Sequence, residues 1–228
     1  MSHREAPHHF LEPPPEFQGL HPEKPIRIYY GDLPHWRQEG ATYFVTFRLA
    51  DSLPQQCLVE IAAIRRQWEL AHPEPRDESA WLDYGRQVGM KQEEWLDKGC
   101  GSCALNRQDC AELVADAMKF FDGQRYHLGA FVVMPNHVHV IFRPLGDQTI
   151  EDIMMSWKGF TARKVNQLLN RTGQFWQRES YDTIVRDCGH LAKAVAYIGA
   201  NAAKAGLKPE NHPRWVRPDW EKAGYGFV

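Results

Sequence analysis

The stretch that decides the fold is FVVMPNHVHVIFRP, residues 131–144. Its β-branched and aromatic residues form two runs separated by Pro135-Asn136, which predicts strands at 126–134 and 137–143 joined by a tight turn. Successive side chains of a strand point to opposite faces, so His137 and His139 share one face of the second strand. The stretch therefore predicts a β-hairpin that carries two imidazoles side by side, either as ligands of one metal ion or as a hydrogen-bonded pair.

The segments around this hairpin alternate between strand and helix patterns. Apolar periodicity predicts helices at 53–70, 107–121, 149–169 and 190–206, and β-branched or aromatic runs predict strands at 41–49 and 181–185. The order predicts an α+β fold with antiparallel strands in one layer and helices in another. The segment 72–107 is acidic and contains several Pro and Gly residues, and we expect an inserted loop region there.

Composition excludes several classes of protein. The chain has 228 residues, 43% hydrophobic and 25% charged, which is ordinary for a globular domain, and it has no apolar run of the ~20 residues that span a bilayer. Residues 1–25 contain three consecutive prolines and no apolar core, so we expect a flexible N-terminal arm without a signal sequence, and a cytoplasmic protein. The five cysteines include one CxxC pair, too few ligands for a structural zinc site, and we expect free thiols.

The charge is unevenly distributed along the chain. The formal net charge is −2, yet residues 156–208 hold nine Lys and Arg against three acids. Such a segment is typical of a face that binds a polyanion, although ordinary solvated helix faces give the same count.

The last predicted helix, 190–206, carries Tyr197 and, four residues later, Asn201. These positions lie one turn apart on the same helix face. If that face meets His137 and His139, two imidazoles and a carboxamide oxygen could hold a metal ion beside a phenol, a set suited to phosphoryl transfer onto tyrosine. Without such a meeting, a Tyr and an Asn on a helix are packing or surface residues.

Six motifs, taken together, resemble a known family. The chain is similar to the Y1 transposases of the HUH superfamily, in particular to the REP-associated tyrosine transposases, which are related to the IS200-like transposases. The resemblance covers roughly residues 30–208 and rests on the motifs at 41–49, 133–140 (VMPNHVHV), 156–161 (SWKGFT), 176–182 (WQRESYD), 185–187 and 197–207 (YIGANAAKAGL).

The resemblance implies a ferredoxin-like or RRM-like antiparallel sheet, the HUH fold, over residues 26–208, with the insertion at about 72–107 and a C-terminal tail at 209–228. It implies His137, His139 and Asn201 as ligands of Mg²⁺ or Mn²⁺ and Tyr197 as the nucleophile. The tyrosine would attack single-stranded DNA at REP-like hairpins, leaving a 5′-phosphotyrosine and a free 3′-OH. The expected activity is thus that of a metal-dependent endonuclease and strand transferase. One departure is Ala202, where the family usually has proline after the asparagine; the helix can therefore continue to Gly206.

Several alternatives stay open. Tyr181, in the ESYD motif, is the rival nucleophile, but it lacks an i+4 ligand partner. The DNA-binding candidates are basic residues of the second half: Lys158, Arg163, Lys164, Arg178, Arg186 and Lys204. The alternative function is a catalytically idle, domesticated protein that binds nucleic acid sequence-specifically. A hydrolase of small phosphoesters is disfavoured because the basic segment exceeds what such a substrate needs. The sequence does not decide between a monomer and a dimer.

Overall fold

The computed structural model describes residues 11–31 and 33–227, with Tyr30 and Pro209 described by their backbone alone. Residues 1–10 of the expected N-terminal arm lie outside this range. The elements in chain order are β1 (Arg27–Tyr30), β2 (Pro34–Arg37), β3 (Tyr43–Arg48), α1 (Gln55–Ala71), α2 (Glu78–Asp97), η1 (Ala104–Asn106), α3 (Gln108–Lys119), β4 (Tyr126–Val133), β5 (His137–Pro144), α4 (Ile150–Leu168), β6 (Tyr181–Ile184), α5 (Cys188–Lys204), η2 (Pro209–Asn211), β7 (Arg214–Val216) and α6 (Pro218–Lys222).

The central sheet is antiparallel and has the strand order β6-β3-β5-β4-β7. Four strands of this sheet and the two helices α3 and α4 have the chain order β3-α3-β4-β5-α4-β6, with α1, α2 and η1 inserted between β3 and α3. This order is the βαββαβ arrangement of ferredoxin-like folds. The expected α+β class and the ferredoxin-like sheet are therefore confirmed. The pattern predicted β3, β4, β5 and β6 because these strands contain β-branched and aromatic residues, whereas the short strands β1, β2 and β7 were not predicted.

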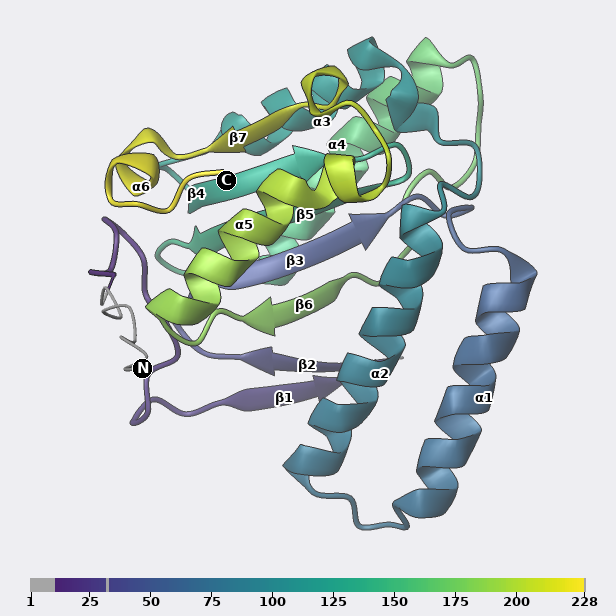
Figure 1. The fold of residues 1–228 in the computed structure, drawn as a ribbon, viewed down its shortest axis with the longest axis vertical. Coiled ribbons are helices and arrows are strands. Elements are labelled where there is room, and N and C mark those ends of the chain that lie inside the picture. The colour runs from purple at the N-terminus through teal and green to yellow at the C-terminus, as the bar shows by residue number, and fades with distance from the viewer. Residues whose placement is uncertain (1–10, 32, 228) are drawn as a thin grey trace, which may run out of the picture.

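The two faces of the sheet are covered by different helices (Figure 1). On one face the main core packs α3 and α4 against alternate strand residues such as Val45, Val138 and Val140. On the other face α5 packs on Ala130, Val132 and Ile141 through Leu191, Val195 and Ile198. His139 is paired with Thr46 across β3 and β5, and His137 with Arg48, so these four side chains belong to the α5 face.

The inserted region is largely helical, which corrects the expected loop at 72–107. After α1 the chain turns at 72–77 and continues as α2, a 20-residue helix whose N-terminal amide of Ala80 donates to the Asp77 carboxylate at 2.8 Å. The two helices form a hairpin with its own small core, in which Trp68, Tyr84 and Val88 are buried. Figure 1 shows α2 running across the ends of the strands near β3 and β6, with α1 on the side of α2 that is away from the sheet.

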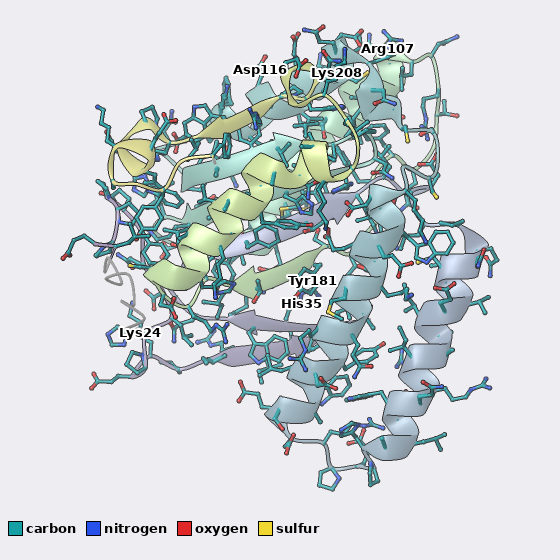
Figure 2. All side chains as sticks on the ribbon, viewed as in Figure 1. Lys24, His35, Arg107, Asp116, Tyr181 and Lys208 are labelled. Atoms are coloured by element: carbon teal, nitrogen blue, oxygen red, sulfur yellow. The ribbon has the colours of Figure 1, made fainter. Side chains whose placement is uncertain are left out.

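A two-stranded hairpin, β1–β2, extends the layer beyond β6. Ion pairs between side chains join it to β6. His35 Nδ1 lies 2.6 Å from Asp182 Oδ1, and the Arg37 guanidinium donates to the same carboxylate. Figure 2 places His35 and Tyr181 beside α2 at this edge. Burial opposes the charged form of His35, but hydrogen bonds to Asp182 and Glu179 outweigh it and raise the pKa of His35 to about 9.

Both ends of the described chain close the sheet on the β4 side. In the expected tail, β7 pairs with β4 and α6 buries Trp220 against Gly129, where a β-carbon would lie 2.2 Å from the indole ring. In the described part of the expected arm, residues 11–17 contact this tail, where Trp220 Nε1 donates to the Pro15 carbonyl at 2.8 Å. Residues 18–25 instead bond to Gln38 and Thr42, just before β3. None of the described helices is long and apolar enough to cross a membrane.

Candidate metal centre and active site

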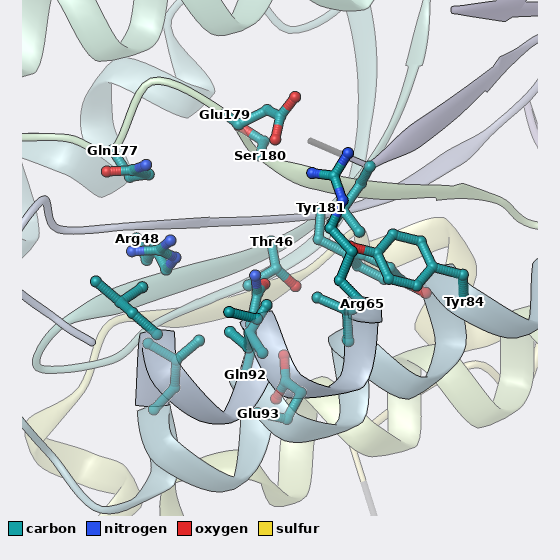
Figure 3. A pocket seen from close by; sticks show the side chains of 17 residues that line it. Thr46, Arg48, Arg65, Tyr84, Gln92, Glu93, Gln177, Glu179, Ser180 and Tyr181 are labelled. Atoms are coloured by element: carbon teal, nitrogen blue, oxygen red, sulfur yellow. The ribbon is translucent and has the colours of Figure 1, made fainter. Parts of the chain in front are cut away.

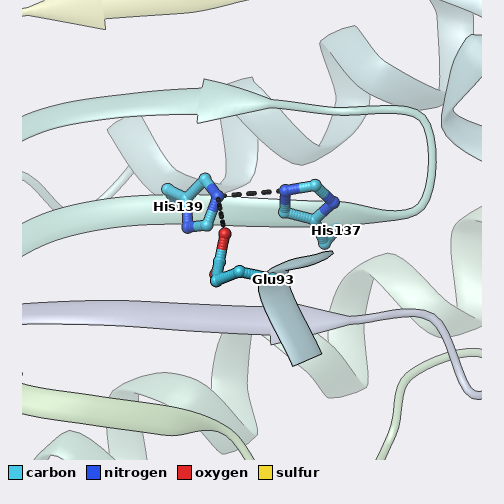
Figure 4. Close-up of side chains that lie close together, drawn as sticks. All are labelled: Glu93, His137 and His139. Carbon is cyan, nitrogen blue, oxygen red and sulfur yellow. Dashed lines mark hydrogen bonds and ion pairs between the residues drawn. The ribbon is translucent and has the colours of Figure 1, made fainter. Parts of the chain in front are cut away.

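His137 and His139 lie side by side on β5, and both are completely buried. Their Nε2 atoms face each other at 3.0 Å (Figure 4). Desolvation is the main cause that lowers the pKa of both rings, to about 3 for His139 and well below the ordinary value for His137. Both imidazoles are therefore neutral at physiological pH, which is the form that binds metal.

The other nitrogen of each ring is held by a neighbouring side chain. His137 Nδ1 donates to Asn136 Oδ1 at 2.8 Å, and His139 Nδ1 is hydrogen-bonded to Thr46 Oγ1 at 2.8 Å. The Asn136 amide is fixed in turn, since its Nδ2 donates to the carbonyls of Leu96 and Cys100 at the end of α2. With a proton on Nδ1 of each ring, the Nε2 lone pairs of both rings would be directed at one point and could bind one metal ion.

A carboxylate from α2 completes this group. Glu93 Oε2 lies 3.7 Å from His139 Nε2, and the ligand atoms of Glu93, His137 and His139 all lie within 4.8 Å of one another (Figure 4). Burial raises the pKa of the Glu93 carboxyl, and the nearby His137 and the Tyr197 hydroxyl oppose that rise. In the described part of the chain this is the one cluster of three His, Cys, Asp or Glu side chains with metal-ligand spacing.

The Tyr197 phenol, on α5, contacts the carboxylate of Glu93 as well. Its hydroxyl donates to Glu93 Oε2, and its ring lies edge-on to His139 with centroids 5.2 Å apart. Burial first, and then the charge of Glu93, raise the pKa of the Tyr197 phenol far above its ordinary value of 10. The phenol is therefore fully protonated and needs a base before it can act as a nucleophile.

Asn201 lies one turn further along α5 and is completely buried. Neither its Oδ1 nor its Nδ2 has a hydrogen-bond partner of good geometry, although the amide is close enough to shift the pKa of both His137 and Tyr197. Buried carboxamides usually have hydrogen-bond partners of good geometry, so the Asn201 amide oxygen is available as a ligand beside the His137 ring.

The donor set fits a divalent cation. The two neutral imidazoles are hydrogen-bonded to each other through Nε2 at 3.0 Å, and they present two nitrogen ligands to one point, with a carboxylate and the Asn201 amide oxygen beside them. Mixed nitrogen and oxygen ligands suit Mn²⁺ and other first-row metals, and the oxygen ligands suit Mg²⁺.

The residues of this centre that come from β5 and α5 lie in a stretch that matches a known protein family. Residues 105–201 match the family described as "Transposase IS200 like", a stretch that contains both histidines and runs through Tyr197 to Asn201. Over these residues, which are somewhat less than half of the chain, the protein is similar to the IS200-like transposases. A search among characterised proteins finds no match. Among solved structures, one described as a REP-associated tyrosine transposase bound to a REP hairpin is 16% identical, covers 80% of this chain and 74% of its own, and has a TM-score of 0.38.

An open groove of about 840 Å³ lies beside the centre, between α2 and α5. Phe44, Tyr181 and Thr183 of β3 and β6 form its floor, and Tyr197 and Glu93 line it from the two helices. Its basic side chains are Arg86, His190, Lys193 and Lys204, and its acids include Glu94 and Asp97.

Tyr181, the rival nucleophile, lies on the same sheet face as the histidines but on a different strand. It is opposite Thr46, which is in turn opposite His139, so β3 separates it from β5 by two strand spacings, or ~10 Å. Its ring packs on Gly89 of α2, where a β-carbon would lie 3.1 Å away, and burial raises the pKa of its phenol.

The six expected DNA-binding residues are dispersed over the structure. Lys204 is at the groove, 3.1 Å from Asp97 and 5.4 Å from the centre of the Tyr197 ring. Lys158 is mostly buried: its ammonium donates to the carbonyls of Gln177 and Arg178 and to Ser180 Oγ, and desolvation lowers its pKa to about 8. Arg178 precedes β6 and Arg186 precedes α5, both exposed; Arg163 and Lys164 are exposed on α4, across the sheet from Tyr197.

Three residues at the centre were missed from the sequence: Glu93, Thr46 and Asn136. Asn136 stands in the MPNHVH motif and Thr46 in the first strand, so strand pairing alone would have brought Thr46 opposite His139. Glu93 lies more than forty residues upstream of the histidines in the expected loop, and its only signal was the apolar spacing of Ala80, Tyr84 and Val88 along a helix.

Proposed function

We propose that the protein is a metal-dependent single-strand DNA endonuclease and strand transferase of the REP-associated tyrosine transposase type, with Tyr197 as nucleophile. One observation carries the proposal. The carboxylate of Glu93 contacts the Tyr197 hydroxyl and at the same time faces both buried imidazoles, so nucleophile, proton acceptor and metal ligands meet at one point. A protein that only binds DNA needs no such set.

The chain's own groups account for the proton and for the attack. The raised basicity of buried Glu93 suits it to take the proton of the Tyr197 hydroxyl, to which it is already hydrogen-bonded. The phenolate oxygen then forms a bond to the phosphorus of a DNA phosphodiester. The bond from phosphorus to the 3′-oxygen breaks, and that oxygen leaves as a 3′-OH with a proton from water. The products are a 5′-phosphotyrosine and a free 3′ end, which later attacks in strand transfer.

For the cation we propose His137, His139 and Glu93 as ligands, with the Asn201 carboxamide oxygen as a further one. The unsatisfied Asn201 amide supports this role, and Glu93 adds the carboxylate that the family resemblance did not supply. When bound, Mg²⁺ or Mn²⁺ would polarise the phosphate and stabilise the charge that develops on it.

The proposed substrate is single-stranded DNA next to a REP-type hairpin, and the α2–α5 groove is its path to Tyr197. Arg86, Lys193 and Lys204 supply positive charge along the groove, and the exposed Arg178 and Arg186 lie on the same domain as candidates for the hairpin's phosphates. Phe44 and Tyr181 on the groove floor offer aromatic surfaces for unpaired bases.

The test of the nucleophile is covalent trapping. Wild type, Tyr197→Phe and Tyr181→Phe are incubated with labelled single-stranded REP-type hairpin DNA and Mn²⁺, then run on a denaturing gel. We expect a protein–DNA band that is lost only in Tyr197→Phe. Loss only in Tyr181→Phe would transfer the role to that residue. Absence of a band from every variant, with DNA still bound, would favour the idle DNA-binding protein instead.

The test of the ligands is Mn²⁺ binding measured by electron paramagnetic resonance without DNA. We expect His139→Ala and Glu93→Gln each to weaken binding at least tenfold, and Asn201→Leu to weaken it less, since a neutral amide is the poorer donor. Gln92→Leu, the neighbour of Glu93 on α2, is the matched control and should bind as wild type does. Unchanged affinity in Glu93→Gln would remove Glu93 from the ligand set.

A further inference from the structure

A second cavity lies on the other side of α2 from the groove, between the α1–α2 hairpin and the ends of β3 and β6. It has a volume of about 270 Å³. Figure 3 shows Arg48 and Gln177 at one end of it, Tyr84 at the other, and Thr46 and Gln92 between them. This volume is close to the lower end of the ~300–1,000 Å³ range of ligand pockets, so it suits one ring system.

The lining combines apolar walls with a few polar ends. Leu58, Ile61 and Val88 of the two helices form the walls. The polar groups are guanidinium, carboxamide and carboxylate: Arg48, Arg65, Gln92, Gln177, Glu179 and Glu93. Guanidinium and carboxamide groups pair with the donor and acceptor edges of nucleobases, whereas the two carboxylates oppose a phosphate or another anion in this cavity.

The cavity shares its wall with the candidate active site. Gly89, Glu93 and Tyr181 line both this cavity and the groove that contains Tyr197. Thr46, on the cavity floor, is the residue that holds His139 Nδ1 at 2.8 Å. A DNA strand with its phosphate at Tyr197 would thus have the cavity within reach of a neighbouring nucleoside.

We propose that this cavity is a nucleobase subsite, which takes one unpaired base turned out of the DNA strand beside the phosphate that Tyr197 attacks. The inference rests on the proposed function and adds a specificity-determining site to it. Stacking against apolar walls and hydrogen bonds to the base edges hold a flipped base in proteins that act on DNA, and this cavity offers both. The subsite is built by the inserted α1–α2 hairpin together with the sheet.

The experiment fills the cavity and removes bases one at a time. Ala62 lines the cavity from α1, and Ala62→Trp would fill it without deleting a polar group. Ala63→Trp, the exposed neighbour outside the lining, is the matched control. Each protein is tested with hairpin oligonucleotides in which a single abasic site replaces each nucleotide flanking the cleaved phosphate. The readouts are the rate of adduct formation and, in a Tyr197→Phe background, binding by fluorescence anisotropy.

For wild type and Ala63→Trp we expect one abasic position that lowers the adduct rate at least tenfold. Ala62→Trp should be slow on intact DNA and lose that position-specific penalty. If Ala62→Trp keeps the penalty, the subsite is overturned while the transposase function stands.

If no protein forms an adduct, the proposed function fails, and the binding series then decides the subsite separately. A single sensitive position that Ala62→Trp abolishes would support it, and uniform binding at all positions would overturn it.

Discussion

The orientations of the His137 and His139 rings are set by hydrogen-bonding groups behind the rings. Thr46 Oγ1 and Asn136 Oδ1 each hold an Nδ1, and Asn136 is itself anchored on the carbonyls at the end of α2. Groups of this kind orient metal-binding imidazoles and raise their basicity, and their loss typically costs 10- to 100-fold in metal affinity.

At the residue scale, Thr46→Val should therefore lower the affinity for Mn²⁺ by about 10- to 100-fold. It should also reduce the free energy of unfolding by about 1–3 kcal/mol, because the buried His139 Nδ1 loses its hydrogen-bond partner. Electron paramagnetic resonance and urea denaturation measure the two effects.

Thr183→Val is the matched control, since Thr183 faces the same side of the sheet from β6 and pairs with Phe44. It should leave Mn²⁺ binding unchanged. Equal affinities in Thr46→Val and wild type would show that the His139 ring is oriented without its hydroxyl partner.

At the element scale, α2 decides the shape of the site because it approaches β6 closely. Two of its positions are glycines, and their surroundings differ. A β-carbon at Gly85 would make an ordinary 3.9 Å contact with Pro34, whereas at Gly89 it would lie 3.1 Å from the Tyr181 ring. Gly89 therefore permits the approach that brings Glu93, one turn later, to the histidines.

We expect Gly85→Ala to raise the free energy of unfolding by up to about 1 kcal/mol, because alanine has the higher helix propensity. Gly89→Ala should gain less or lose stability, because the Tyr181 ring must move, and it should weaken Mn²⁺ binding by displacing Glu93. Urea denaturation and Mn²⁺ titration of both variants check this. Equal gains in stability with unchanged Mn²⁺ binding would mean that the approach of α2 tolerates a methyl group.

The fold was predictable where a single element had a strong periodic pattern. The hairpin of β4 and β5 was predicted because 131–144 has two strand runs around a Pro-Asn turn, and helix α5 because 190–206 has an unbroken helix pattern. Helix α2 was missed because its two glycines and nearby prolines lowered its apparent propensity, while packing against the sheet and α1 overrides propensity. Glu93 was lost with it, since a single sequence does not reveal which distant helix meets a strand.

The β1–β2 hairpin is joined to β6 by a contact that depends on pH. Asp182 and Glu179 face His35 from β6 and the segment before it, and Arg37 lies near it on β2. The folded protein holds the His35 proton up to about pH 9, whereas the unfolded chain releases it near pH 6.5.

The contribution of His35 to stability is thus complete below pH 6.5 and is lost as the pH rises through 9. The free energy of unfolding should fall across that window, by at most about 1.4 kcal/mol per pH unit for this proton. His35→Gln should flatten the decline, and His21→Gln, at an exposed histidine, should not. Denaturant titrations from pH 6 to 9 measure it, and an equal slope in His35→Gln and wild type would contradict the assignment.

On the scale of the whole molecule, the two faces of the sheet differ: one forms the structural side, with the apolar core, and the other contains the candidate active site. The face under α3 and α4 is a continuous apolar core, and the face under α2 and α5 contains the histidines, Tyr197, the groove and the cavity. β7, α6 and residues 11–17 close the β4 side of the sheet, and the α1–α2 hairpin lies on the β3–β6 side, beside the site.

This division predicts which basic residues bind the DNA strand. The double variant Arg86→Gln/Lys193→Gln neutralises charges of the groove, and Arg163→Gln/Lys164→Gln removes the same number from the outer side of α4. If two phosphate contacts are lost, the slope of log affinity against log salt should become shallower by about 1.4, or ~0.7 per contact for single strands. We expect that change in the groove variant and at most a small one in the α4 variant. Fluorescence anisotropy with hairpin DNA at several salt concentrations measures both slopes. A larger loss in the α4 variant would place the DNA on the structural side, and its strand would then have to cross the sheet edge to reach Tyr197.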